Sequence, residues 1–240
     1  TLNGEVMRAK DKVLEGDQVV LMAEMEAAID FKPETMALDI VYEDDDVIVV
    51  NKPVGLVVHP AAGNYSGTLL NGLLAHCPEL QTLPRAGIVH RLDKDTSGLL
   101  VVARTPAAQA RLVKALAARD IEREYLALCQ GRVTAGGTVD EPLGRHRTQR
   151  TKMAVRPDGR EAITHYRIER RFRAHTLLRV QLETGRTHQI RVHLAHIGHP
   201  IVGDPVYGGR KRLPAGASPV VIDALQSFPR QALHATRLAF

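Results

Sequence analysis

Two short apolar runs rich in β-branched residues, residues 47–51 and 99–103, most constrain what this chain can fold into. Each run has the length of a strand and ends at charged or turn-forming residues, so each predicts a buried β-strand. The helices and strands predicted along the chain do not alternate in a regular βαβ rhythm, which favours an α+β fold over a doubly wound parallel sheet. The further predictions are strands at residues 121–129, 162–168 and 177–182, and helices at residues 68–76, 105–119 and 187–197.

Capping signals define the ends of two of these helices. Thr105 is an expected N-cap, with Pro106 at the first helical position. Thr187 is the expected N-cap of a second helix, which ends before Gly198. Arg191 would then lie in the first turn of this helix, near the loops at the helix N-terminus.

Charge is distributed unevenly along the chain. Residues 1–46 hold 4 basic and 13 acidic side chains, whereas the remainder holds 28 basic and 14 acidic ones. Arginine outnumbers lysine, and its planar guanidinium matches phosphate oxygens in two places. The distribution suggests a body that binds a polyanion, preceded by an acidic segment. A basic surface that only keeps the protein soluble would give the same composition.

Cysteine, apolar and histidine patterns exclude several classes of protein. Cys77 and Cys129 cannot form a disulfide framework and make no zinc-type pair, so the reducing cytoplasm is the expected location. No apolar run approaches the ~18 residues of a membrane span, and no signal pattern opens the sequence, so no membrane association is expected. His193 and His196 have a spacing that could share a metal ion, but no cysteine or nearby carboxylate completes the set. We therefore expect no metal site.

The densest polar segment, residues 87–98, lies between apolar runs and can present side chains at the edge of a sheet. Asp95, Ser97 and Gly98 fit a capped turn, in which short polar side chains bond to local amides and glycine adopts a φ that other residues resist. Asp93 is set apart from these turn residues. Turn chemistry therefore explains Asp93 less readily than it explains these residues.

Several ordered motifs resemble one enzyme family. His90-Arg91-Leu92-Asp93, followed by Thr96-Ser97-Gly98, is similar to the signature of the RluA-type pseudouridine synthases, which isomerise uridine in RNA. A set of ordered motifs in one chain is far more specific than a single match. The other segments that resemble this family are residues 47–56, 123–127, 184–193, 198–208 and 234–235, and together the motifs cover most of residues 40–240.

The resemblance implies a fold and a domain organisation. Residues 40–240 would form the catalytic domain, with a central mixed, mainly antiparallel sheet flanked by helices and loops and a cleft across the sheet. Residues 1–22, which predict two short strands, resemble the remnant of a small N-terminal RNA-binding domain. The acidic residues 23–39 are expected to form a linker. Such a leading domain is typical of the subgroups that modify large-subunit ribosomal RNA.

The resemblance also implies the reaction. Specific uridines in large-subunit (23S) ribosomal RNA, free or in a pre-ribosomal particle, would be flipped out and isomerised to pseudouridine by an essential aspartate. No atoms enter or leave, so no cofactor is expected. We expect a monomer, because no coiled-coil seam or surplus apolar stretch suggests otherwise. The alternative is a ribosome- or RNA-binding protein that retains the fold without catalysis.

Three residues would carry the reaction by this resemblance, and their joint presence disfavours the alternative. Asp93 is the catalytic carboxylate, which either attacks the anomeric carbon or removes a sugar proton to give a glycal. Arg191 is its expected partner, and a guanidinium opposes the rise in carboxyl pKa that desolvation would cause. Tyr125 is expected against the flipped uracil, where it stacks and can remove the ring proton in the last step.

Basic side chains would bind the RNA around this centre. Arg91 is similar to the family arginine that helps fill the gap left by the extruded uridine, and His90 either contacts RNA or holds the loop. Residues 145–152 form the strongest basic run and are expected to clamp phosphates rather than form only a solvated hairpin. The residues expected to line this groove are Arg145, Arg147, Arg150, Lys152, Arg186 and His188.

Overall fold

The computed structural model describes residues 2–3, 6–7, 12–20, 31–61, 63–211 and 213–240. The chain divides into two compact units, Thr1–Phe31 and Lys32–Phe240. In the first unit, Leu2 and Val19 form an isolated antiparallel bridge, so the described part of this unit contains a single bridge in place of the two predicted strands.

A linker was predicted at residues 23–39, and its residues 23–30 lie outside the described part of the chain. From Lys32 the chain packs with the second unit. Asn71 Nδ2 donates to the carbonyl oxygen of Lys32 at 2.8 Å, and Asn51 Nδ2 donates to Asp39 at 2.7 Å. The exact domain boundaries stay a prediction.

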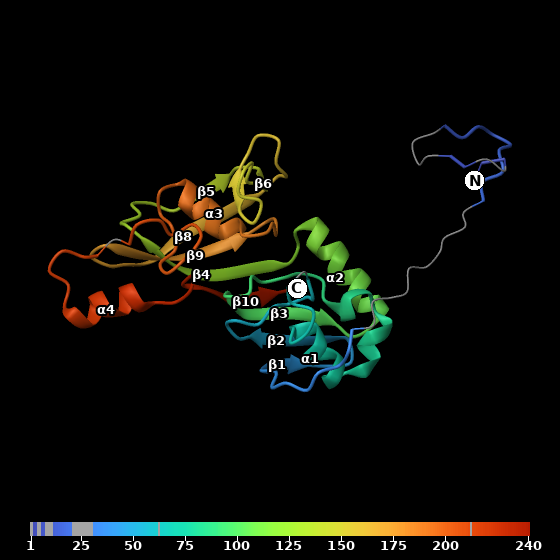
Figure 1. Ribbon diagram of the computed structural model, residues 1–240, viewed down its shortest axis with the longest axis horizontal. Coiled ribbons are helices and arrows are strands. Elements are labelled where there is room, and N and C mark those ends of the chain that lie inside the picture. The colour runs from blue at the N-terminus through green and yellow to red at the C-terminus, as the bar shows by residue number, and fades with distance from the viewer. Residues whose placement is uncertain (1, 4–5, 8–11, 21–30, 62, 212) are drawn as a thin grey trace. The chain divides into compact units, whose positions relative to one another are not determined.

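One eight-stranded sheet dominates the second unit (Figure 1). All neighbouring strands are antiparallel except β3 and β10, which run parallel. The predicted α+β class and the mixed, mainly antiparallel sheet are therefore confirmed. In spatial order the strands are β1 (Ile40–Glu43), β2 (Val47–Lys52), β3 (Ser97–Ala103), β10 (Leu233–Ala239), β4 (Glu122–Gln130), β9 (His175–Leu182), β8 (Ile163–Arg171) and β5 (Gly137–Asp140).

Helices and a small hairpin flank this sheet. The hairpin consists of β6 (Leu143–Arg145) and β7 (Met153–Val155) and is separate from the large sheet. The α-helices are α1 (Leu69–His76), α2 (Pro106–Ala118), α3 (Gln189–His196) and α4 (Pro219–Ser227), and two 3₁₀ turns cover Pro78–Thr82 and Pro84–Gly87. No helix in the described ranges is both long and apolar enough to cross a bilayer.

Most of the predicted capping signals are confirmed. Thr105 accepts a hydrogen bond from the backbone N–H of Ala108 at 3.1 Å, which begins α2. Gly198 adopts a positive φ of 79° directly after α3. The predicted cap of α3 is wrong by one residue: the N-cap is His188 rather than Thr187, with a left-handed φ of 57° and no side-chain capping bond. The ring of His188 instead contacts the hydroxyl of Tyr207.

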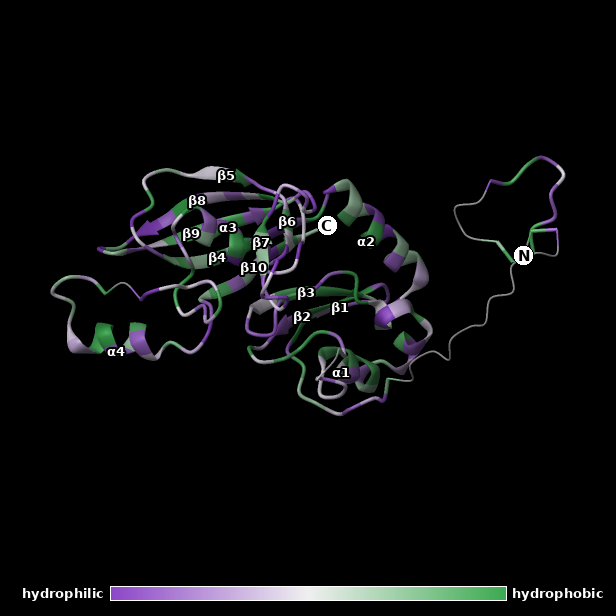
Figure 2. Cartoon of the chain, turned by 45° about the horizontal axis from the view of Figure 1, so that its top comes forward, coloured by the Kyte–Doolittle hydropathy of each residue, from purple (hydrophilic) through white to green (hydrophobic). Residues whose placement is uncertain are grey.

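One apolar core lies on the half of the sheet that contains β2 and β3. Alternate side chains of β2 and β3 pack against α2. The side chains between them point to the other face and are also fully buried, which is why these runs are apolar at every position: Ile48, Val50, Leu100 and Val102. Figure 2 shows α1 and α2 on opposite sides of these strands. The cluster beneath α2 consists of Val47, Val49, Val101, Ala103, Ala108, Leu112 and Ile121.

The seam between β3 and β10 joins the two halves of the sheet. It is paired at Ser97 with His234 and at Gly98 with Ala235. Gly98 has a φ of +114°, and a Cβ there would lie 2.2 Å from the carbonyl oxygen of Ala235. The prediction that Gly98 supplies a φ that other residues resist is therefore confirmed, and close strand approach adds a second reason for glycine.

Replacing Gly98 by alanine is expected to lower the free energy of unfolding by more than about 2 kcal/mol, because the new Cβ meets backbone atoms and the φ is strained. Urea denaturation measures this change. Gly209→Ala is the matched control, since Gly209 has a φ of +60° but open space around its Cβ position. Equal losses in the two variants would mean that strain in φ, and not the close approach of the strands, requires the glycine.

Candidate active site

An ion pair joins Asp93 and Arg191, which are 98 positions apart in the sequence. Asp93 lies in the loop before β3, and Arg191 lies in the first turn of α3 as predicted. Arg191 Nη1 donates to Asp93 Oδ2 at 3.0 Å. The side chain of Asp93 is 16% exposed and that of Arg191 only 6%, so the carboxylate is reachable while its partner is buried. This arrangement places an accessible carboxylate against a buried guanidinium.

A second carboxylate, Asp204, holds Arg191 from the other side. Arg191 Nε and Nη2 donate to the two oxygens of Asp204 at 2.7 and 3.0 Å, and the Asp204 side chain is fully buried. Burial opposes ionisation of Asp204, but Arg191 and the backbone N–H groups of Val206 and Tyr207 hold its pKa below the ordinary value. Burial likewise opposes the charge of Arg191, and the hydrogen bonds and charges of Asp204 and Asp93 raise its pKa above the ordinary value.

Tyr125 lies on β4 and is buried. Burial raises the pKa of its hydroxyl to about 12, and the charge of Asp93 adds to this rise, whereas the charge of Arg123 opposes it. Asp93 is thus close enough for its charge to act on Tyr125. Arg123 lies two positions earlier on the same face of β4 and donates to the carbonyl oxygen of Glu183 at 3.0 Å. Its Nε is buried without a partner among the described residues.

His188 and Tyr207 complete the described surroundings of Asp93. His188 Nε2 lies 4.0 Å from Asp93 Oδ1, and His188 Nδ1 lies 2.8 Å from the hydroxyl of Tyr207. The guanidinium carbon of Arg191 lies 5.0 Å from the centre of the Tyr207 ring, within range of a cation–π contact. Burial is the main cause that lowers the pKa of His188.

Hydrogen bonds from distant segments fix the loop that carries Asp93. Lys52 is fully buried, and its Nζ donates to the carbonyl oxygens of Pro53, Leu56 and Lys94 at 2.8 to 2.9 Å. Burial lowers the pKa of Lys52 to about 8, against the charges of Asp95 and Asp93. From the other side, Ser97 Oγ lies 2.9 Å from His234 Nδ1. The position of the carboxylate is therefore determined by β2 and β10 together.

His90 and Arg91, predicted to bind RNA, differ in their environment. Arg91 is exposed beside Asp93, where it can reach a substrate. His90 is half-buried, and its Nε2 accepts a hydrogen bond from the backbone N–H of Val101 on β3 at 3.1 Å. Of the two roles considered for His90, this contact corresponds to holding the loop.

The basic run lies in the hairpin formed by β6 and β7. Arg147 and Arg150 are exposed, and neither makes an ion pair with any residue that the structure describes. Arg145 Nη1 donates to the carbonyl oxygen of Arg150 at 3.0 Å, and Lys152 is half-buried at the end of the turn. Arg186 is half-buried before α3 and donates from Nε to the carbonyl oxygen of Glu161 at 2.9 Å.

The base of this hairpin contacts the site directly, because Met153 donates its backbone N–H to the Tyr207 hydroxyl at 2.9 Å. Met153, Val155 and Tyr207 also pack against a small core formed by Leu143, Ala162 and Val192. The described residues contain no group of three His, Cys, Asp or Glu side chains arranged to hold a metal ion.

Asp204, Tyr207 and Lys52 were not among the residues predicted to form the site. Asp204 and Tyr207 belong to the segment 198–208, which was noted for its family resemblance, and Lys52 belongs to the segment 47–56. A charged residue next to an apolar run was the signal that could have identified Lys52 and Asp204, since a charged side chain is rarely buried without a partner. The sequence held no such signal for Tyr207.

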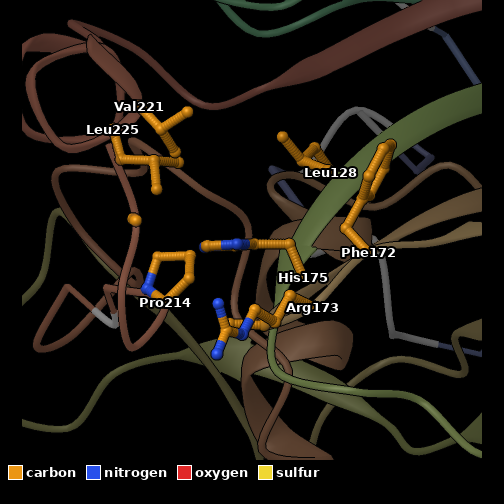
Figure 3. Close-up of a pocket in the computed structure, with 9 residues that line it drawn as sticks. Leu128, Phe172, Arg173, His175, Pro214, Val221 and Leu225 are labelled. Carbon is orange, nitrogen blue, oxygen red and sulfur yellow. The ribbon is translucent and has the colours of Figure 1, made fainter. Parts of the chain in front are cut away.

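An apolar pocket of about 360 Å³ lies away from these residues, between α4 and the ends of β4 and β9 (Figure 3). Leu128 lines it. Side chains alternate along β4, so Leu128 faces the opposite side of the sheet from Tyr125. This pocket is therefore not part of the candidate site. Its lining residues are Leu128, Phe172, Arg173, Ala174, His175, Pro214, Ala217, Val221 and Leu225.

Comparison with known proteins identifies similar sequences over nearly the whole chain. Residues 46–196 match the family model described as RNA pseudouridylate synthase. The chain is 62% identical over 238 residues to "Ribosomal large subunit pseudouridine synthase D" of Escherichia coli K12, covering 99% of this chain and 73% of that protein. The protein of the same name from Vibrio vulnificus is 56% identical over 241 residues, covering 100% of this chain and 74% of that protein.

Two solved structures have a similar fold. "Human RNA Pseudouridylate Synthase Domain Containing 4" has a TM-score of 0.64 and 26% identity, covering 83% of this chain and 82% of that chain. "Human RNA Pseudouridylate Synthase Domain Containing 1" has a TM-score of 0.63 and 27% identity, covering 84% of this chain and 78% of that chain. The predicted resemblance to the pseudouridine synthase family is confirmed.

The half-buried imidazole of His90 is expected to make stability depend on pH. Burial, together with the charge of Arg123, lowers the pKa of His90 from 6.5 to about 4, so the unfolded chain takes up a proton that the folded protein does not. Stability is therefore lost as the pH falls from about 6.5 to about 4. In His90→Gln, the loss of unfolding free energy between pH 7 and pH 4.5, measured by urea denaturation, is expected to shrink by about 2 kcal/mol.

His196→Gln serves as the control, because His196 is exposed at the end of α3. The pH dependence is expected to shrink more in His90→Gln than in His196→Gln. Equal changes in the two variants would mean that the environment of His90 is not the cause.

Proposed function

The chain belongs to the family of RNA pseudouridylate synthases, and from this premise we propose that it isomerises uridine to pseudouridine in large-subunit ribosomal RNA, with Asp93 as the essential carboxylate. Membership makes the protein an RNA pseudouridine synthase. The target RNA is proposed from the names of its relatives, and RNA in a pre-ribosomal particle is an equal candidate for the substrate. The observation that carries the assignment of Asp93 is its 3.0 Å ion pair with the buried Arg191.

The proposed reaction begins at Asp93. Arg191 favours the ionised carboxylate, and Asp204 fixes the direction of the guanidinium. The carboxylate either bonds to the anomeric carbon or removes a sugar proton. In both routes the bond from this carbon to the uracil nitrogen breaks, and its electron pair leaves with the uracil. The uracil then turns, and a ring carbon bonds to the anomeric carbon. This bond displaces the carboxylate in the first route, and in the second the carboxyl group returns the sugar proton. The ring carbon then loses its proton and the freed ring nitrogen gains one, so the product has the same atoms as the uridine.

Tyr125 fits the last step of this sequence. With a pKa of about 12 it is a neutral phenol in the free protein, suited to stacking on a base. Burial, the main cause of the raised pKa, does not change during the reaction, whereas the charge of Arg123 opposes it. A base role in removing the proton from the ring carbon therefore requires the hydroxyl to give up its own proton in the same step.

RNA would approach over the exposed arginines. Arg91, exposed beside Asp93, is proposed to stabilise the stack vacated by the flipped uridine, which offsets part of the cost of flipping. The exposed cations of the hairpin between β6 and β7 are proposed to contact phosphates, because no described acidic side chain neutralises Arg147 or Arg150 in an ion pair. The predicted monomeric state and cytoplasmic location stay predictions.

Asp93→Asn is expected to lower the turnover number by at least about 10³-fold while RNA affinity changes by less than about threefold, since the amide keeps the shape of the carboxylate and loses its charge. Pseudouridine mapping in purified large-subunit RNA, with EDTA present, measures turnover, and filter binding measures affinity. Asp95→Asn, two residues along the same loop, is the control and is expected to retain turnover. RNA binding by the unaltered protein without product would favour the non-catalytic alternative. Appreciable turnover by Asp93→Asn would remove Asp93 from its assigned role.

Replacing Arg147 and Arg150 together by alanine is expected to weaken RNA binding and to reduce the slope of log affinity against log salt concentration by about 1.5 to 2, because two phosphate contacts are lost. Filter binding across a salt series measures both quantities. The paired control replaces Arg111 and Lys114 by alanine. Both residues are exposed on α2, and their replacement removes the same charge from the protein. An identical slope change in both pairs would mean that net charge, and not the hairpin, accounts for the effect.

A further inference from the structure

We infer that Tyr207 is a positioning residue that fixes the tautomer of His188, so that His188 presents an Nε2–H donor beside Asp93 to the uracil that leaves during bond cleavage. The assignment of the leaving uracil rests on the proposed function. The tautomer itself follows from the hydrogen bonds of the protein alone.

The hydroxyl of Tyr207 determines the direction of the first bond. A backbone N–H can only donate, so Tyr207 Oη accepts at its 2.9 Å contact with Met153 N. The hydroxyl has one proton, and the other hydrogen-bonding contact described for this oxygen is His188 Nδ1 at 2.8 Å. If Nδ1 carried a proton, the hydroxyl proton would have no acceptor among the described residues. The satisfied arrangement is Tyr207 O–H donating to an unprotonated Nδ1.

The charges around His188 keep the ring neutral. Burial disfavours the protonated ring, and the charges of Arg191 and Arg91 act in the same direction. The charges of Asp93 and Asp204 favour protonation but do not outweigh the other causes, so the pKa of His188 lies below its ordinary value. A neutral ring whose Nδ1 accepts must carry its proton on Nε2.

This Nε2–H group has no hydrogen-bond partner among the residues that the structure describes. Its nearest charged neighbour is Asp93 Oδ1 at 4.0 Å, which is beyond hydrogen-bond distance. The His188 side chain is 22% exposed, so the donor is accessible at the carboxylate proposed to react. When the bond to uracil breaks, the base leaves with the electron pair, and a fixed donor close to the reacting carbon stabilises that charge.

The backbone supports a role for the ring other than capping. His188 occupies the N-cap of α3 with a left-handed φ of 57°, a conformation that is uncommon outside glycine. It makes no side-chain capping bond, although an N-cap side chain ordinarily bonds to the first turn. Its ring instead meets the Tyr207 ring edge to face, with centroids 5.6 Å apart. The left-handed backbone thus accompanies a ring that contacts Tyr207 in place of the first turn of α3.

Tyr207 is itself firmly placed for this purpose. Its backbone N–H donates to Asp204 Oδ1 at 2.9 Å, and its ring lies beneath the Arg191 guanidinium. Asp204 therefore orients both Arg191 and Tyr207. The buried Asp204 thus positions both groups that lie beside Asp93. It holds the Arg191 guanidinium directly, and it holds the His188 imidazole through Tyr207.

Nitrogen-15 NMR of histidine-labelled protein tests the tautomer without any RNA. In the unaltered protein, His188 is expected to give the signature of a ring protonated at Nε2. In Tyr207→Phe this signature is expected to shift toward the Nδ1–H tautomer or toward a mixture, because the hydroxyl donor is gone. Tyr42→Phe is the control, since its hydroxyl bonds to Asp44 outside the site. A ring protonated at Nδ1 in the unaltered protein would overturn the inference.

Single-turnover rates on large-subunit RNA test the consequence. Tyr207→Phe is expected to lower the rate of product formation roughly tenfold with little change in RNA affinity, as for the loss of one oriented hydrogen bond. His188→Ala is expected to lose at least as much. His188→Gln supplies an amide N–H near the Nε2 position without needing Tyr207. Its rate is therefore expected to exceed that of His188→Ala. Adding Tyr207→Phe to His188→Gln is expected to cause no further loss of rate.

Equal losses from Tyr207→Phe in the native and His188→Gln backgrounds would contradict the inference, because Tyr207 would then act without His188. A protein that forms no pseudouridine but shows the Nε2–H signature would refute the proposed function and the leaving-group role, while the tautomer assignment would stand. The two failures are therefore distinguishable.

Discussion

The buried guanidinium of Arg191 lies between the carboxylates of Asp93 and Asp204, and the rest of the site depends on this arrangement. One positive charge cannot neutralise two negative ones, so the backbone N–H groups that bond Asp204 are needed as well. Removing one of these charged side chains leaves another buried charge uncompensated. The resulting loss of folding stability is far larger than the contribution of a surface ion pair. Stability and reactivity therefore depend on the same three side chains.

The scaffold holds this group by joining segments from distant parts of the sequence. Lys52 at the end of β2 bonds to the Asp93 loop from one side, and Ser97 and His234 connect the loop to β10 from the other. On the opposing side, α3 carries Arg191 and is anchored to β8, where Gln189 Nε2 donates to Thr164 Oγ1 at 3.0 Å. Hydrogen bonds of buried polar groups thus hold both sides of the site.

Local sequence signals predicted the strands β2, β3, β4, β8 and β9 and three of the described helices. They did not predict β10, the short strands β1, β5, β6 and β7 or the helix α4, and they predicted the contacts between elements poorly. The strands β2 and β3 and the helix α2 followed from apolar runs and a Thr-Pro cap, which are local features. Asp93 and Arg191 were predicted as partners through family resemblance, since nothing local relates two residues 98 positions apart. His188 replaced Thr187 as the cap because its ring is engaged by Tyr207, a tertiary contact that no helix-start rule contains. Asp204 was missed for the same reason, because its role exists only once Arg191 is beside it.

The position of β10 within the sheet has a consequence for biosynthesis. This strand is the last of the described strands in the chain, yet it lies between β3 and β4 in the interior of the sheet. Until residues 233–239 have emerged from the ribosome, the nascent polypeptide has two half-sheets that lack their common neighbour, and the Asp93 loop lacks its contact with His234. Pairing of this strand with β3 also spans a long stretch of chain, which slows assembly. The reactive centre is therefore completed only after translation has passed this strand, and a shortened polypeptide would expose two unpaired strand edges.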